Sequence, residues 1–238
     1  AALCEVTGAD IREVGKAVGT DTRIGTKFLN SGPGFGGSCF KKDILNLVYL
    51  CRHFGLPEVA DYWQNVVTLN TWQQDRIARL IVKELFGTVT GKRLAIFGFA
   101  FKANTNDTRE APAIQIAKDL LEEGAQLAIY DPKVEAKQIT LDLKLNPCEP
   151  ASEKSGLTQA EISGEGTWWP AQQMSDAVKG ADAVLILTEW EQFHQLDWMT
   201  LASLMRQPAW VFDARSVVNP IAIKNAGLKL WRVGDGAT

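Results

Sequence analysis

The sequence contains few histidines and few cysteines, and this scarcity argues against several kinds of site. His53 and His194 are the two histidines among 238 residues, and there are four cysteines. No two cysteines stand in a C-x-x-C pair, the spacing typical of zinc and redox sites. A disulfide scaffold needs a denser set of cysteines, and a Ser-His-Asp triad needs a suitable histidine. We therefore expect no metal site, and a cysteine thiol is the first candidate for any nucleophile.

Long apolar runs and basic clusters are missing as well. The longest apolar stretches, such as Leu94–Ala100 and Ala183–Leu187, fall far short of the roughly 20 residues that cross a bilayer. The first residues show no signal-peptide pattern. The net charge is −3, from 25 basic and 28 acidic residues, without the basic runs that a nucleic-acid backbone requires. We expect a cytoplasmic globular protein that binds neither membrane nor nucleic acid.

The first 86 residues predict a helical domain interrupted by one glycine-rich loop. Asp10 followed by Glu13 is a capping pattern and predicts a helix that ends at Gly19. Apolar residues at helical spacing predict two more helices, over 41–55 and 57–86. A helix of 30 residues is about 45 Å long, more than the width of a small domain, so we expect it to pack against a second subunit.

From residue 87 onward the pattern changes to short apolar runs, which predicts a second domain over 87–238. Helical patterns around 113–123, 171–179 and 198–204 alternate with these runs, as in a doubly wound parallel sheet. The stretch from Lys144 to Pro170 has no sustained period and is predicted to leave the sheet as a long excursion. The predicted strands are 92–99, 126–132, 182–188, 209–214 and 228–234.

The glycine-rich loop GPGFGGSCF places Cys39 directly before a predicted helix. Backbone N–H groups at the helix start, together with Lys41 and Lys42, would favour the reactive thiolate. Asp43 follows one helical turn later, where it could hold a water or polarise a hydroxyl. The alternative is that Cys39 is a buried residue of the helix start and Asp43 a partner of the helix dipole. The residues alone leave both interpretations open.

A second group of polar residues follows the first predicted strand, at the sheet edge where ligands of open α/β sheets bind. Phe101 could stack on a base, while Lys102 and Arg109 could bind a diphosphate or a carboxylate. Arg215 follows another predicted strand and should reach the same edge. The alternative is a polar loop in which Arg109 pairs with Asp107. Converging cations at this edge favour a site for a small anionic ligand.

Five motifs in order, GPGFGGSCFKKD, FGFAFKANTNDTR, IYDPKV, LTEWEQF and FDAR, resemble the UDP-glucose 6-dehydrogenases of the nucleotide-sugar dehydrogenase (UDP-glucose/GDP-mannose dehydrogenase) family. The resemblance covers nearly the whole chain except 144–170. It implies a helical dimerisation core, residues 1–86, and a Rossmann-like UDP-sugar-binding domain, residues 87–238. It also implies a homodimer or higher homo-oligomer that oxidises UDP-glucose twice with NAD⁺, giving UDP-glucuronate through a thiohemiacetal and a thioester on a cysteine.

The resemblance assigns roles residue by residue. The catalytic cysteine corresponds to Cys39, and the aspartate that helps to activate water or steady the oxyanion corresponds to Asp43. Arg23 corresponds to an arginine that reaches the substrate across the dimer interface, and Arg109 to a contact with NAD. The other residues that match substrate contacts are Phe28, Leu29, Asn30, Gly36, Phe101, Lys102 and Arg215.

The sequence departs from the family pattern at its N-terminus. The family pattern begins with a dinucleotide-binding domain carrying G-x-G, whereas the present sequence begins inside an apparent helix, and Gly98 alone does not form that fingerprint. The hypothesis is that the chain is the carboxyl-terminal part of the enzyme, with NAD bound mainly by an absent domain, and is inactive alone. The alternatives are a dehydrogenase of UDP-N-acetylmannosamine, UDP-N-acetylglucosamine or GDP-mannose, and a non-catalytic UDP-sugar-binding or dimerisation module.

Overall fold

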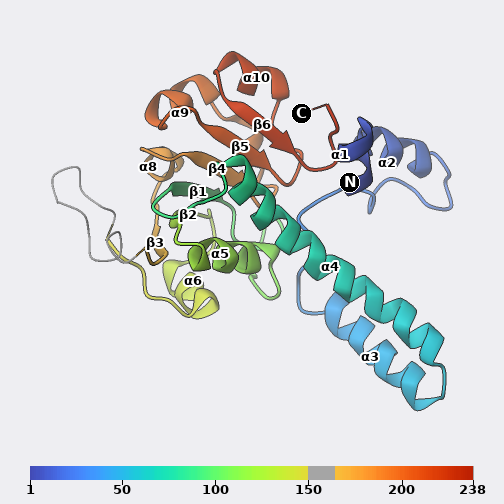
Figure 1. Cartoon of the computed structure of the whole chain (residues 1–238). Helices are drawn as coiled ribbons and strands as arrows, with labels where there is room; N and C mark the ends of the chain where they lie inside the picture. Colours follow the sequence, from blue (N-terminus) through green and yellow to red (C-terminus); the bar gives the residue numbers. More distant parts are fainter. Residues whose placement is uncertain (150–163, 238) are drawn as a thin grey trace.

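A parallel β-sheet organises most of the chain in the computed structural model, which describes residues 1–149 and 164–237 (Figure 1). Its six strands lie in the order β3-β2-β1-β4-β5-β6, and all neighbouring pairs are parallel. The order reverses direction between β1 and β4, so the sheet is doubly wound and the predicted fold class is confirmed. The strands are β1 (Arg93–Phe97), β2 (Gln126–Tyr130), β3 (Thr167–Pro170), β4 (Ala183–Ile186), β5 (Trp210–Asp213) and β6 (Lys229–Arg232).

The central strands are mostly apolar because helices cover both faces of the sheet. Every residue of β4 is buried, and so are all residues of β1 and β5 after the first. Helices α4 (Pro57–Glu84), α5 (Pro112–Glu122) and α6 (Ala136–Leu143) form one layer. Helices α8 (Met174–Val178), α9 (Trp198–Leu204) and α10 (Pro220–Asn225) form the other, and the short 3-10 helix η1 (Glu191–Gln195) precedes α9.

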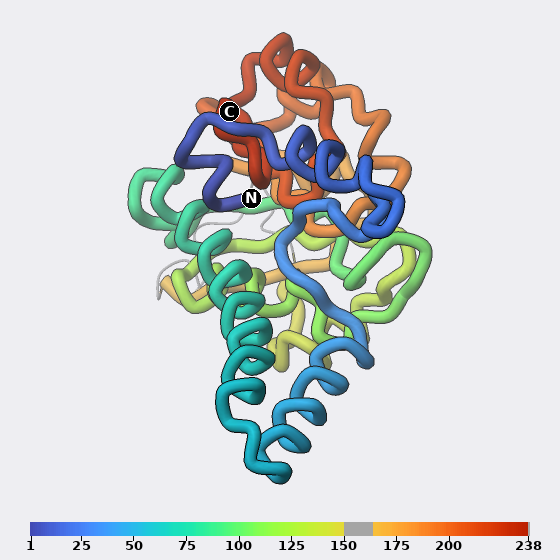
Figure 2. Tube along the Cα trace, turned by 90° about the vertical axis from the view of Figure 1, so that its right-hand side faces the viewer, coloured from blue at the N-terminus to red at the C-terminus, as the bar shows by residue number. Residues whose placement is uncertain are grey.

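Helix α3 (Phe40–His53) and the first half of α4 form a hairpin that projects away from the sheet (Figure 2). The hairpin has a small core of its own, made by Ile44, Val48, Cys51, Ala60 and Val67. The second half of α4 instead joins the main core through Ile77 and Ile81. One helix of 28 residues therefore connects both cores, and the domain boundary at 86/87 stays a prediction. No helix within the described ranges is long and apolar enough to cross a membrane.

The first helices, α1 (Ala2–Thr7) and α2 (Ile11–Gly19), dock beside the end of β6, the last strand (Figures 1 and 2). The N–H of Ile11 donates to the carbonyl of Gly234 at 2.8 Å, and the N–H of Gly236 donates to the carbonyl of Ala9 at 2.9 Å. Glu5 accepts from the N–H of Gly234 at 2.8 Å and pairs with Arg76 at 2.6 Å. These contacts hold α2 close to the carboxyl edge of the sheet.

The structure differs from the sequence-based account of the second domain in two respects. The predicted excursion 144–170 includes β3, which pairs with β2 at the edge of the sheet; its middle, 150–163, lies outside the described residues. An edge strand tolerates Pro170, and a proline beside two tryptophans hides the strand pattern in the sequence. Helices α6 and α10 were not predicted either.

Candidate functional site

The glycine-rich loop of residues 32–39, here called the cysteine loop, runs against the loop after β1, residues 101–110, here called the β1 loop. The N–H of Gly37 donates to the carbonyl of Arg109 at 2.8 Å, and Lys41 pairs with Glu110 at 2.7 Å. The two predicted groups of functional residues, around Cys39 and around Phe101, are therefore brought together at the carboxyl edge of the sheet.

Two glycines make this contact possible. A Cβ on Gly36 would lie 2.4 Å from the carbonyl oxygen of Glu110 and 3.0 Å from the Cβ of Phe101, so no side chain fits there. Gly37 has a φ of 87°, in the left-handed region that glycine adopts without strain, and its face is covered by the Phe101 ring. The position of the cysteine loop thus depends on backbone that carries no side chains.

Cys39 is the residue that directly precedes α3, as predicted, and it is exposed rather than buried. Its Sγ lies 3.6 Å from the Oγ of Ser38. Asp43 stands in the first turn of α3, where its N–H donates to the carbonyl of Cys39 at 2.8 Å and its side chain is exposed. A thiol and a carboxylate one helical turn apart are both accessible from outside the chain.

Arg109 lies in the same neighbourhood and pairs with Asp107 at 2.6 Å, as the polar-loop alternative predicted. The hydrogen bond to Asp107 is the main cause that raises the pKa of Arg109, and the charge of Cys39 adds a smaller effect in the same direction. The same pair lowers the pKa of Asp107. The Arg109 guanidinium is therefore within electrostatic reach of the thiol while it remains exposed.

Arg215 follows β5 and is held by two other segments of the sheet edge, the one after β4 and the one after β1. Its Nε donates to the carbonyl of Leu187 at 2.9 Å, and its Nη2 donates to the carbonyl of Phe101 at 3.0 Å. Its Nη1 lies 3.2 Å from Oε2 of Glu189, an ion pair without hydrogen-bond alignment. Burial lowers the pKa of Arg215, and the charges of Glu189 and Asp213 oppose that shift. The arginine reaches the predicted edge but is more deeply buried than its sequence indicates.

A cleft of about 520 Å³ lies between α2 and this edge, within the usual size of a small-molecule site. Three predicted site residues line it, Leu29, Asn30 and Arg215, whereas Cys39, Asp43, Phe101 and Lys102 do not. Sequence reasoning missed the two basic residues of α2, Arg12 and Lys16, and also His194 of η1, which all line the cleft. The spacing of Arg12 and Lys16, four residues apart on one helix face, was the available signal.

Two predicted residues lie away from this cleft. The side chain of Phe28 is 98% exposed and lines a separate apolar hollow of about 590 Å³ with Phe35, Leu69 and Trp72. The side chain of Arg23 is exposed and pairs with Asp21 at 2.6 Å. Neither residue is positioned by contacts with the α/β domain.

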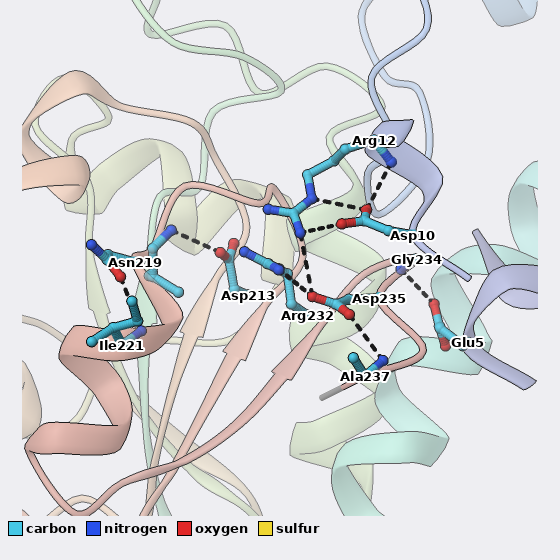
Figure 3. Close-up of polar contacts among 11 residues, drawn as sticks. Glu5, Asp10, Arg12, Asp213, Asn219, Ile221, Arg232, Gly234, Asp235 and Ala237 are labelled. Atoms are coloured by element: carbon cyan, nitrogen blue, oxygen red, sulfur yellow. Dashed lines mark hydrogen bonds and ion pairs between the residues drawn. The ribbon is translucent and has the colours of Figure 1, made fainter. Parts of the chain in front are cut away.

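The wall formed by α2 is anchored by a chain of charges (Figure 3). Arg12 pairs with Asp10 at the start of its own helix and lies 3.5 Å from Asp235, which in turn pairs with the buried Arg232. The hydrogen bond from Arg12 is the main cause that lowers the pKa of Asp10. The network links α2 to the segment after β6 and so fixes the width of the cleft.

Family models cover most of this chain. The model for the central domain of the UDP-glucose/GDP-mannose dehydrogenase family matches residues 1–72, and the model for the UDP binding domain of that family matches residues 95–220. The second match alone spans more than half of the chain. The chain therefore belongs to the UDP-glucose/GDP-mannose dehydrogenase family.

Two of the similar curated proteins are UDP-glucose 6-dehydrogenases. UDP-glucose 6-dehydrogenase 4 of Arabidopsis thaliana is 46% identical over 235 residues, which cover 98% of this chain and 48% of the relative. The UDP-glucose 6-dehydrogenase of Caenorhabditis elegans is 47% identical over 233 residues, covering 98% and 46%. The chain thus spans about half the length of the curated relatives it matches.

Solved structures agree with this assignment. The UDP-glucose dehydrogenase of Pyrobaculum islandicum superimposes with a TM-score of 0.72 at 27% identity, over 98% of this chain and 45% of that one. An NDP-N-acetyl-D-galactosaminuronic acid dehydrogenase from Methanosarcina mazei gives a TM-score of 0.73 at 19% identity over 99% and 46%, and shares the fold.

Gly36→Ala should separate the cysteine loop from the β1 loop. We expect it to destabilise the protein by about 1–3 kcal/mol, as for other overpacked sites, because the new methyl group would meet the Glu110 carbonyl. Urea denaturation measures the change. Gly32→Ala is the control, since its Cβ would lie 3.4 Å from Arg215 and has room. Equal stability of the Gly36→Ala variant and the wild type would contradict the close contact.

Asp10→Asn should destabilise the protein at neutral pH but not in acid. Because the pKa of Asp10 is lowered in the folded chain, its contribution to stability is present above the ordinary value of 3.8 and is lost as the pH falls through the lowered pKa. Unfolding free energies of variant and wild type, measured from pH 7 downward, should converge below that value. Glu13→Gln, an exposed change on the same helix, is the control, and a difference that persists in acid would contradict the ion-pair role.

Proposed function

We propose that this chain provides the substrate site and the subunit contact of a UDP-glucose 6-dehydrogenase. The observation that carries the proposal is the docking of the cysteine loop on the sheet edge, next to the half-buried Arg215 and its cleft. Relatives of that name, 44–47% identical, support UDP-glucose as the substrate. The cytoplasmic location expected from the sequence stays a prediction.

The charges of the cleft favour an anionic nucleotide. Arg12 and Lys16 on α2 face Arg215 on the sheet edge, with Glu189 as the acidic side chain among the lining residues. Cationic groups of this kind bind phosphate oxygens with charge-assisted hydrogen bonds. The diphosphate of a UDP-sugar would lie near Arg215, and Leu29 and Asn30 would contact the rest of the ligand. Phe101, whose carbonyl accepts from Arg215, and its neighbour Lys102 would complete the UDP-sugar site.

Cys39 would act as the catalytic nucleophile. Its thiolate would add to the C6 aldehyde of the half-oxidised sugar and form a thiohemiacetal. Loss of a hydride from that carbon would give a thioester, and water would then release the carboxylate and the free thiol. Asp43, one turn from Cys39, would orient that water or steady the oxyanion. Gly36 would let the sugar approach the backbone beside the thiol.

The described residues of the α/β domain do not fit NAD, the hydride acceptor of the family. At the end of β1 a Cβ on Gly98 would lie 2.4 Å from Thr188, so this turn is filled. The N–H groups of Phe99 and Ala100, which could otherwise hold a diphosphate, donate to Asp131. We propose that NAD binds mainly to a part of the enzyme outside this chain, with Arg109 as a contact, and that this chain alone does not turn over.

The projecting hairpin is the proposed contact in a homodimer or higher homo-oligomer. Large apolar side chains remain exposed along it, namely Leu45, Tyr49, Leu50, Phe54, Val59, Tyr62 and Leu69. A patch of this kind is typical of a protein interface. Arg23 and Phe28, which the α/β domain leaves uncovered, would then reach a neighbouring subunit.

Two alternatives remain distinct from this proposal. Another nucleotide sugar, UDP-N-acetylmannosamine, UDP-N-acetylglucosamine or GDP-mannose, could be the substrate, since the cleft charges suit any sugar diphosphate. A non-catalytic module that binds UDP-sugar or promotes dimerisation would need the cleft and the hairpin but not Cys39. The first alternative concerns ligand selectivity and the second concerns the reactivity of the thiol, so different measurements separate them.

Calorimetric titration of the chain should show binding of UDP-glucose in preference to UDP-N-acetylmannosamine and GDP-mannose. Arg215→Ala should weaken UDP-glucose binding by roughly 10- to 100-fold, because a buried charged partner of the diphosphate is lost. Arg206→Ala is the matched control, since Arg206 pairs with Asp182 at the opposite edge of the sheet. Absence of binding by the wild type, or unchanged affinity of Arg215→Ala, would contradict the assigned site.

Alkylation by iodoacetamide at neutral pH should modify Cys39 faster than Cys148, the other exposed cysteine of the described chain. Cys39 stands directly before α3 and within electrostatic reach of Arg109, whereas, among the described residues, no helix starts directly after Cys148. UDP-glucose should slow the modification of Cys39 and leave that of Cys148 unchanged, as mass spectrometry of the labelled peptides would show. Equal rates that do not respond to the sugar would favour the non-catalytic module.

A further inference from the structure

Asp131, in the IYDPKV motif at the end of β2, accepts an unusual number of hydrogen bonds for one side chain. Its Oδ2 accepts from the N–H of Phe99 at 2.7 Å, the N–H of Ala100 at 3.1 Å and the indole N–H of Trp190 at 3.2 Å. Its Oδ1 accepts from the N–H of Lys133 at 2.9 Å and that of Val134 at 3.0 Å. A carboxylate with two acceptor oxygens and no proton suits such a set of donors.

These donors belong to three different segments, which follow β1, β2 and β4. The three strands are neighbours in the sheet, in the order β2-β1-β4, and all end at the same edge. Asp131 therefore ties together the loops that leave the centre of the sheet, at the switch point where ligands of such sheets bind.

Two of the tied loops hold Arg215. Phe101, directly after Ala100, provides the carbonyl that accepts from Nη2 of Arg215 at 3.0 Å. Glu189, directly before Trp190, forms the ion pair with Arg215 at 3.2 Å and accepts from the N–H of Ala103 at 3.3 Å. Two residues that donate to Asp131, Ala100 and Trp190, are thus the sequence neighbours of these two partners of Arg215. Asp131 does not itself line the cleft.

We propose that Asp131 is a positioning residue for the nucleotide diphosphate: it fixes the β1 loop and the segment 188–190 so that Arg215 is held at the cleft. The proposal rests on the proposed function, because it takes a UDP group as the ligand of Arg215. A carboxylate is required, since an amide in its place would turn an NH₂ donor toward backbone N–H donors and leave them unpaired.

Asp131→Asn tests the proposal in the full chain. Its affinity for UDP, measured by calorimetry, should fall roughly tenfold, because an unpaired donor displaces the two loops. Affinity for uridine, which lacks the phosphates, should fall less. In the Arg215→Ala background the same substitution should cause little further loss, because both changes act on one interaction. If the fold-losses of UDP affinity instead multiply in the double variant, Asp131 does not act through Arg215 and the proposal is overturned.

Amide hydrogen exchange provides a readout that needs no ligand. Asp131→Asn should speed exchange in the segments 99–103 and 188–190, whereas Asp197→Asn should speed it only at the start of α9. Asp197 is the matched control because it also accepts backbone N–H groups, from Met199 and Thr200, and lies at a helix end. Asp197→Asn should leave UDP affinity unchanged.

The outcomes separate the two proposals. A wild-type chain that does not bind UDP would contradict the proposed function, while the exchange data would still decide whether Asp131 ties the loops. If Asp131→Asn does not fold, Trp190→Phe, which removes one of the five hydrogen bonds, should show a smaller change of the same sign. Unchanged exchange in 99–103 and 188–190 together with unchanged UDP affinity would overturn the positioning role.

Discussion

The arrangement of the site depends on one close backbone contact, that of Gly36 with the carbonyl of Glu110. It sets how far the cysteine loop can approach the sheet edge and therefore where Cys39 starts α3. The attractive forces nearby are modest: a hydrogen bond from Gly37 to Arg109, and the partly exposed pair of Lys41 with Glu110, a kind that contributes little in water. The position of the cysteine loop is therefore fixed more by the absence of a side chain at Gly36 than by the strength of any bond. Cys39 and the sheet edge are constrained to move together.

Arg215 is a half-buried charge that lines the cleft and is held by polar groups of the sheet edge. Removing a guanidinium from water is costly, and two backbone carbonyls plus Glu189 offset part of that cost. The ion pair with Glu189 lacks hydrogen-bond alignment, so Oε2 of Glu189 has no hydrogen-bond partner although it lies 3.2 Å from Nη1 of Arg215. A phosphate in the cleft would supply the missing acceptor. The ligand preference of the cleft would therefore depend on the groups that surround Arg215 as well as on its charge.

Sequence patterns predict the central sheet well because β1, β4 and β5 are buried on both faces and read as apolar runs. The edge strand β3 escaped, since Pro170 and the surrounding loop residues interrupt its pattern. Arg215 could be placed at the sheet edge because parallel strands end together. The α2 wall of the cleft could not be predicted: it depends on contacts such as Ile11 with Gly234, which join opposite ends of the chain and leave no local signal. Cys39 and Asp43 were located correctly at the start of α3, but their relation to the cleft is a tertiary property.

In other proteins this kind of sheet binds dinucleotides at its switch point. In this chain the same place is occupied by groups of the protein itself. The backbone donors after β1 are bonded to Asp131, and Thr188 fills the space over Gly98. The proposed ligand site lies instead toward β5, in the cleft that Arg215 lines together with α2 and residues 29–31 of the helical part. A ligand that bridges these walls gains affinity only when all of them are docked, so binding must stabilise the docked arrangement by the same free energy. The sheet edge, residues 29–31 and α2 would therefore be thermodynamically coupled through the cleft that they share.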